Sequence, residues 1–136
     1  MNEGTKKILI LEDEPDVVTY LTALFEDHGY ATESARNGQE GMEKAKAAPP
    51  DLITLDMSMP EKSGVRFYRE IKDDPVLSKI PVVVVTGVTG YGGNPDDFRR
   101  FLETRRQVPP PDAFMAKPVD REELLRVVRA LLTRTT

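Results

Sequence analysis

Strand-like and helix-like segments alternate along the whole chain, and this alternation limits the folds that are open to it. Five short strand-like runs are each followed by a segment with apolar residues at helical spacing. Such a repeat is typical of an α/β domain with a parallel sheet. The 136 residues are enough for one domain of this kind and its core. We therefore expect a single domain over residues 1–136, with a core over about residues 6–133 and no output domain.

The five predicted strands differ in character. Lys7–Leu11 is largely apolar, and Asp51–Asp56 has Leu52, Ile53 and Leu55 between its two aspartates, as is typical of strands buried on both faces of a parallel sheet. Pro81–Thr86 contains four consecutive valines, whose branched side chains favour the pleated conformation. Ala31–Ala35 is polar and indicates an edge strand, and a short fifth strand is predicted over Asp112–Pro118.

Helices are predicted between the strands and after the last one. The signals are a proline in a first turn, Asn37 and Asp120 as N-cap residues, and apolar residues three or four positions apart. We interpret Glu14 and Asp16 as acids that favour the dipole at a helix N-terminus. The predicted helices run over about residues 15–28, 38–47, 65–73, 95–107 and from 121 onward.

Composition excludes several classes of protein. No apolar run approaches the roughly 20 residues of a membrane helix, and the N-terminus lacks the apolar segment of a secretory signal. The chain has no cysteine, so it has neither a disulfide framework nor a thiolate metal site, and we expect a cytoplasmic protein. A net charge of -4 gives no general attraction to nucleic acid. We expect neither direct nucleic acid binding nor membrane insertion.

Polar residues stand at the carboxyl ends of the predicted strands. Glu12 and Asp13 follow the first strand, Asp56 ends the third, Thr86 the fourth and Lys117 the fifth. In open α/β sheets, ligands bind beyond these strand ends. If the first and third strands are neighbours, the three carboxylates lie within a few ångströms of one another, which is unfavourable without a cation.

The residue types at this edge predict a particular chemistry. An all-oxygen set without histidine or cysteine suits Mg²⁺ and argues against zinc. Lys117 and Thr86 add a positive charge and a hydroxyl donor, as an anion site beside a metal requires. With Asp56 as a nucleophile for phosphorus, these are the groups needed to form an aspartyl phosphate.

The same residues resemble the receiver domains of two-component response regulators. An acidic pair after a hydrophobic strand, Asp56 before a Met-rich turn and a proline, Thr86 after the valines, and Lys117 before a proline match that family in order, over nearly the whole chain. The resemblance implies a doubly wound, flavodoxin-like domain. Its five-stranded parallel sheet would have the order 2-1-3-4-5 and be flanked by about five helices.

The resemblance also implies roles for single residues. Asp56 would be the phosphoacceptor, Asp13 would bind Mg²⁺ directly, and Glu12 would assist through water. The main-chain carbonyl of Ser58 would be a further metal ligand. The phosphoryl donor would be a histidine kinase or a histidine phosphotransfer protein, because the chain's own single histidine, His28, is interpreted as structural or solvated.

A switch from phosphorylation to partner binding is implied in the same way. Thr86 and Lys117 would contact the phosphoryl group, and Phe114 would be an aromatic switch residue that repacks when Thr86 moves. The face around the fourth helix, fifth strand and fifth helix would bind an unknown downstream protein. The 31 residues from Thr86 to Lys117 exceed the family's spacing by about two helical turns. In the family, the position of Val88 tunes the lifetime of the phosphoryl group, and valine cannot position an attacking water by hydrogen bonding, so we expect slow autodephosphorylation. Beyond this and self-catalysed phosphoryl transfer to Asp56, we expect no enzyme activity.

Other functions on this type of fold are less well supported. A nucleotide-binding protein or flavodoxin-like electron carrier needs a phosphate-binding loop after the first strand, where Glu12, Asp13 and Glu14 would repel phosphate. An aspartyl-nucleophile phosphatase expects a second aspartate at the position of Ser58. A pseudo-receiver, which binds partners without phosphorylation, remains open as the alternative.

Overall fold

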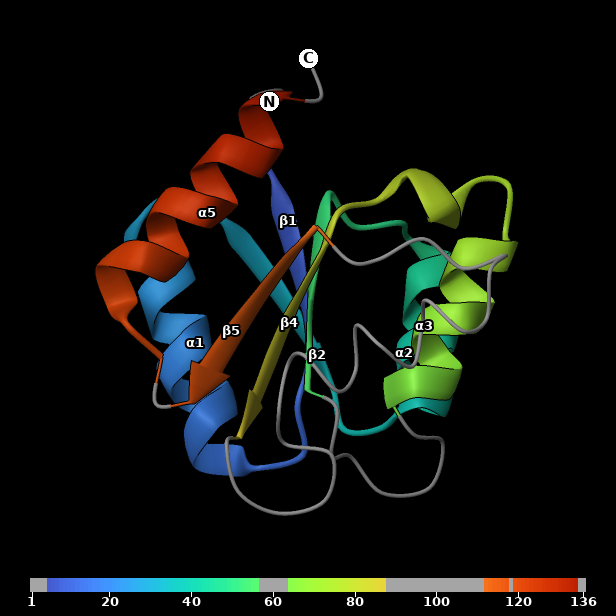
Figure 1. Ribbon diagram of the computed structural model, residues 1–136, viewed down its shortest axis with the longest axis horizontal. Helices are drawn as coiled ribbons and strands as arrows, with labels where there is room; N and C mark the ends of the chain where they lie inside the picture. The colour runs from blue at the N-terminus through green and yellow to red at the C-terminus, as the bar shows by residue number, and fades with distance from the viewer. Residues whose placement is uncertain (1–4, 57–63, 88–111, 118, 135–136) are drawn as a thin grey trace.

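A five-stranded parallel sheet forms the centre of the molecule (Figure 1). The computed structural model describes residues 5–56, 64–87, 112–117 and 119–134. The strand order is β2-β1-β3-β4-β5, which confirms the predicted parallel sheet and its order. β2 lies at one edge, as its polar sequence indicated. The strands are β1 (Lys7–Leu11), β2 (Ala31–Ala35), β3 (Leu52–Leu55), β4 (Val82–Gly87) and β5 (Ala113–Lys117).

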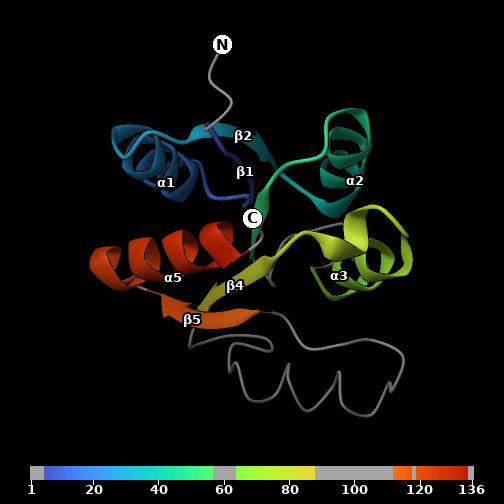
Figure 2. The same cartoon turned by 90° about the horizontal axis from the view of Figure 1, so that it is seen from above.

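Helices cover both faces of the sheet. Figure 2 shows α1 and α5 on one face, and α2 and α3 on the other. The predicted fourth helix, over about residues 95–107, lies outside the described residues. No helix within the described ranges has the length and hydropathy of a membrane span. The helices are α1 (Pro15–Asp27), α2 (Gly38–Ala47), α3 (Gly64–Asp73) and α5 (Arg121–Arg134), with a short 3₁₀ helix, η1 (Leu77–Lys79).

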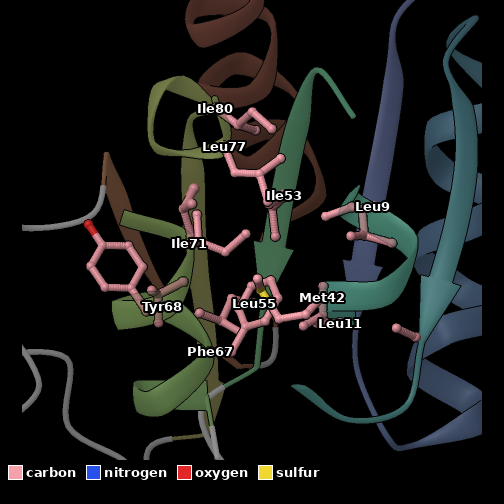
Figure 3. Close-up of a cluster of buried hydrophobic side chains, with 14 residues drawn as sticks. Leu9, Leu11, Met42, Ile53, Leu55, Phe67, Tyr68, Ile71, Leu77 and Ile80 are labelled. Carbon is pink, nitrogen blue, oxygen red and sulfur yellow. The ribbon is translucent and has the colours of Figure 1, made fainter. Parts of the chain in front are cut away.

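The strands divide the core into two clusters because successive side chains point to opposite faces. Leu9 and Leu11 of β1 pack on the side of α2 and α3, in the cluster drawn in Figure 3. Ile8 and Ile10 of β1 pack on the side of α1 and α5. Full burial of each such side chain contributes about 1.5–3 kcal/mol, so both faces of the sheet stabilise the fold.

Gly41 lets α2 come close to the end of β1. A Cβ atom built at Gly41 would lie 2.6 Å from a methyl carbon of Leu11 and 3.1 Å from the ring of Phe67. A side chain here would push against Leu11, which directly precedes Glu12. This contact therefore helps to fix the position of the acidic residues that follow β1.

Side-chain caps define the helix starts as the sequence predicted. Asn37 Oδ1 accepts a hydrogen bond of 2.8 Å from the Glu40 N–H at the start of α2. Asp120 Oδ1 accepts one of 3.1 Å from the Glu123 N–H at the start of α5. After α1, Gly29 has a φ of 90°, a left-handed conformation that glycine adopts without strain.

Strand bounds differ from the prediction by one residue at several ends, and one short helix was not predicted. Asp51 was expected inside the third strand, but β3 begins at Leu52, and the Asp51 carboxylate accepts a hydrogen bond of 2.8 Å from the Lys7 N–H. The 3₁₀ helix η1 was not predicted. It forms because Asp74 Oδ1 accepts hydrogen bonds from the N–H groups of Val76 and Leu77, at 2.8 and 2.9 Å.

Candidate functional site

Backbone hydrogen bonds carry the sheet one residue beyond the ends of β1 and β3. The two strands are neighbours, with Leu11 opposite Leu55. The next residue of each strand continues the pattern, since the Glu12 N–H donates to the Ala35 carbonyl and the Asp56 N–H to the Leu11 carbonyl, both at 3.0 Å. The sheet therefore fixes two acidic residues side by side. Each is only 2% exposed.

Three carboxylates meet at this edge, as the sequence predicted for neighbouring first and third strands. One oxygen from each of Glu12, Asp13 and Asp56 lies within 4.8 Å of the others. Glu12 and Asp56 are buried, whereas Asp13 lies in the bend after β1 and is more exposed. We call these three residues the acidic cluster. These residues follow the ends of β1 and β3, and the strand arrows in Figure 1 point toward those ends.

Lys117 at the end of β5 reaches into the acidic cluster. Its Nζ lies 3.0 Å from Glu12 Oε1, 3.3 Å from Glu14 Oε1 and 3.7 Å from Asp56 Oδ2. The lysine side chain is only 18% exposed. The sequence predicted that Lys117 supplies a positive charge to an anion site beside a metal. In the structure its ammonium lies against the carboxylates.

Burial and mutual repulsion shift the pKa values of the acidic cluster. Burial, followed by the charge of Asp56, raises the pKa of Glu12 to about 7, although Lys117 opposes the shift. Burial and the charge of Asp56 also raise the pKa of Asp13. Burial acts to lower the pKa of Lys117, but its hydrogen bond to Glu12 and the nearby carboxylates outweigh burial and raise it. One lysine does not fully offset the negative charge of the cluster.

The donor set fits a hard divalent cation. Carboxylate oxygens are the ligands that Mg²⁺ prefers, and Mg²⁺ uses one or two of them together with water and other oxygens. Two of the three carboxylates are held by the sheet, and the raised pKa values show that additional positive charge would be favourable. The acidic cluster therefore has the chemistry of a magnesium site.

The structure places the other predicted site residues as follows. Thr86 lies in β4 with its backbone opposite Ala116, and its side chain is outside the described part of the structure. Phe114 in β5 is half-buried and packs against the cluster on the side of α2 and α3. Ser58 and Val88 lie outside the described residues. His28 ends α1, with its Nδ1 2.9 Å from the Leu24 carbonyl oxygen, as expected of a structural histidine.

Glu14 contacts the site, although only a helix-dipole role was predicted for it. It is the N-cap residue of α1, but its side chain makes no capping hydrogen bond and pairs with Lys117 instead. Its N–H donates to Glu12 Oε2 at 3.2 Å. The available signal was its position directly after the acidic pair, on the loop that leaves the strand end.

The chain is similar in sequence to known proteins. A family model described as the response regulator receiver domain matches residues 8–129. The protein PilH of Pseudomonas aeruginosa is 33% identical over 126 residues, which cover 93% of this chain and 97% of PilH. The protein Rrf1 of Nitratidesulfovibrio vulgaris is 36% identical over 84 residues, which cover 62% of this chain but only 61% of Rrf1.

Solved structures give the same picture. The signal receiver domain of a histidine kinase from Syntrophus aciditrophicus is 36% identical, with a TM-score of 0.81 over 95% of this chain and 91% of that one. The receiver domain of a sensor histidine kinase from Pseudomonas aeruginosa, with a magnesium ion coordinated in its active site cleft, is 22% identical. It has a TM-score of 0.80 over 96% of this chain and 99% of that one, a likeness of fold.

Receiver domains are signalling domains that interact with histidine kinases or phosphotransfer proteins and with downstream targets. The family binds Mg²⁺ at its acidic site. The family model covers most of this chain, the relatives agree with it, and the strand order is that of the family's fold. The chain therefore belongs to the response regulator receiver domain family of two-component signalling.

Proposed function

We propose that this chain is a phosphorylation switch whose phosphoacceptor is Asp56. The observation that carries the proposal is a buried aspartate, held by the sheet at the carboxyl end of β3, beside two more acids and a lysine. A structural acid would gain nothing from such crowding, because like charges at this separation destabilise the folded state. The arrangement suits a site that receives a cation and a phosphoryl group.

The proposed reaction is transfer from a phosphohistidine of a histidine kinase or phosphotransfer protein. A carboxylate oxygen of Asp56 forms a bond to phosphorus while the phosphorus–nitrogen bond breaks, and the electron pair of that bond returns to the donor imidazole. Burial of Asp56 at 2% exposure supports this role, because it limits the access of water to the acyl phosphate. The backbone bond to Leu11 fixes the aspartate before the reaction.

Glu12, Asp13 and Asp56 would hold Mg²⁺, with the main-chain carbonyl of Ser58 as a further ligand. When bound, Mg²⁺ would neutralise the phosphoryl oxygens and so allow a carboxylate to approach them. Lys117 would contact the phosphoryl group from the end of β5, together with Thr86. The support from the described residues is the proximity of Lys117 to Asp56 and the raised pKa values of Glu12 and Asp13.

We further propose that β5 links phosphorylation to partner binding. It carries Lys117 at its end and Phe114 three residues earlier, and Phe114 packs against the core cluster on the side of α2 and α3, so one strand joins the acidic cluster to that part of the core. The face expected to bind a partner is the one around the fourth helix, β5 and α5. Repacking of Phe114, coupled to Thr86, would alter that face and control the binding of a downstream protein. Autodephosphorylation is proposed to be slow, because Val88 cannot position an attacking water. Residues 1–136 are proposed to form one receiver domain.

Intact mass measurement after incubation with Mg²⁺ and acetyl phosphate tests the acceptor. We expect one added phosphoryl group on the wild type, none on Asp56→Asn, and none when a chelator removes the metal. Asp51→Asn is the matched control, because it replaces the aspartate just before the start of the same strand. This variant should acquire the phosphoryl group as the wild type does.

Two results would contradict the phosphoacceptor role. The first is a wild type that binds Mg²⁺ but acquires no phosphoryl group, which would favour the pseudo-receiver that acts by binding alone. The second is an Asp56→Asn variant that acquires the group as readily as the wild type. In that case another side chain would be the acceptor.

A further inference from the structure

Lys117 is shared among three carboxylates, and the contacts are unequal. Its Nζ is closest to Glu12 at 3.0 Å, donates a hydrogen bond of 3.3 Å to Glu14, and lies 3.7 Å from Asp56, beyond hydrogen-bond distance. The ammonium is therefore held toward the residues that follow β1. In this position it does not hydrogen-bond the residue proposed to accept the phosphoryl group.

Glu14 differs from the other two partners of Lys117. Glu12 and Asp56 belong to the acidic cluster and are buried, whereas the Glu14 side chain is 64% exposed and is not part of the cluster. The Glu14 carboxylate is thus outside the proposed metal site, and its side-chain contact with that site is made through the lysine. Its carboxylate can attract the ammonium without competing for the same cation.

The backbone holds Glu14 in place for this contact. Its N–H donates to Glu12 Oε2 at 3.2 Å, and the next residue, Pro15, begins α1 with a fixed φ. Two anchors therefore set the direction in which the side chain leaves the loop. The contact with Lys117 also joins the start of α1 to the end of β5, which are 103 residues apart in the sequence.

We propose that Glu14 is a positioning residue that holds Lys117 in a resting place and releases it when Asp56 carries a phosphoryl group. This inference rests on the proposed function. The phosphoryl oxygens and the Glu14 carboxylate compete for the same ammonium, and the pairing with Glu14 stabilises the unphosphorylated arrangement. Loss of the Glu14 charge then shifts the balance toward the phosphorylated arrangement.

A spectroscopic test can be made on the metal-free, unphosphorylated protein. Glu14→Gln should change the NMR signal of the Lys117 ¹⁵Nζ group, which is identified by its loss in Lys117→Arg. Asp16→Asn is the matched control. It removes one negative charge from the first turn of α1, and Asp16 lines the same surface hollow as Lys117, yet no ion pair joins the two within the described residues. Asp16→Asn should leave the signal nearly unchanged.

A binding test addresses the release. Beryllofluoride, which mimics a phosphoryl group on aspartate, is titrated by calorimetry in the presence of Mg²⁺. Glu14→Gln should bind it about two- to five-fold more tightly than the wild type, the ratio expected for a partly exposed ion pair. Asp16→Asn should differ much less. In a Lys117→Ala background, Glu14→Gln should have no larger effect than Asp16→Asn.

The outcomes separate the two proposals. A wild type that neither binds beryllofluoride nor accepts phosphoryl from acetyl phosphate overturns the proposed function and the release step with it, while the NMR signal still reports on the pairing. An unchanged Lys117 signal in Glu14→Gln overturns the pairing. Equal tightening by Glu14→Gln and Asp16→Asn shows a general charge effect and overturns the positioning role.

Discussion

Aspartate and glutamate side chains have different partners at the two ends of the parallel strands. We call the end at which the strands begin the amino edge of the sheet, and the end at which they stop the carboxyl edge. At the amino edge, Asp51 accepts the Lys7 N–H at 2.8 Å and Asp112 accepts the Val82 N–H at 2.9 Å. Each of these aspartates satisfies a backbone donor next to the start of a strand. At the carboxyl edge, the three carboxylates of the acidic cluster lie close to one another, and Lys117 contacts two of them, Glu12 and Asp56. The difference lies in the partners: the acids at the amino edge satisfy backbone donors, whereas those at the carboxyl edge crowd against one another and against Lys117.

The largest expected effect comes from the carboxyl edge, where Glu12 should make the free energy of unfolding depend on pH. Burial holds the pKa of Glu12 at about 7 in the folded state, against 4.5 ordinarily. The folded state therefore keeps this proton to higher pH than the unfolded chain, so stability is lost as pH rises from about 4.5 to about 7. In metal-free protein this amounts to on the order of 3 kcal/mol, measurable by urea unfolding across that range.

Glu12→Gln provides the control for this prediction. The variant has no titrating carboxyl group at this position, so the loss of stability between pH 5 and 7 should nearly disappear. With saturating Mg²⁺ the wild type should also lose this slope, because metal binding requires ionised carboxylates. If Glu12→Gln loses as much stability between pH 5 and 7 as the wild type, another group is the source of the pH dependence.

At the amino edge, removal of an acid should destabilise the protein. Asp112→Ala leaves the N–H of Val82 without its acceptor, and Val82 is fully buried. An unsatisfied buried donor costs about 1–3 kcal/mol, which urea unfolding at neutral pH would detect. Asp112→Asn keeps an acceptor oxygen and should lose much less. Equal losses in both variants would show that charge, rather than the hydrogen bond, is what Asp112 contributes.

The smallest effect is expected at the carboxyl edge. Asp13→Asn removes one of three crowded charges, so metal-free protein should be stabilised by less than about 1 kcal/mol. The variant should also lose most of the rise in melting temperature that Mg²⁺ gives the wild type, because ligand binding to the folded state is the source of that rise. Thermal unfolding with and without Mg²⁺ measures both. A destabilised Asp13→Asn variant would contradict the comparison between the edges.

Much of the fold was predictable because its signals are local. Four consecutive valines favour a strand through their own branched side chains, and Asn37 caps α2 through a residue only three positions away. The short helix η1 was missed although its signal, Asp74 followed by proline, is equally local. The strand order came from the resemblance to receiver domains, because adjacency of strands depends on contacts between distant segments.

The sequence predicted which acids form the candidate site, but not the contacts of its lysine. Strand ends place Glu12, Asp13 and Asp56 together once the order of the sheet is known. The sequence could not show that Lys117 rests on Glu12 and Glu14, because this depends on where a long side chain points across the folded sheet.

The contact between Glu14 and Lys117 also has a consequence for the order of folding. Its partners are 103 residues apart, so closure of this pair demands nearly the whole chain. β1 and β3 can pair earlier, but their ends then bring three acids together before the lysine has arrived. Addition of β5 supplies the missing charge. Lys117 therefore reaches the carboxylates only when β5 joins the sheet. A chain in which β5 has not yet joined lacks this lysine at the acidic cluster.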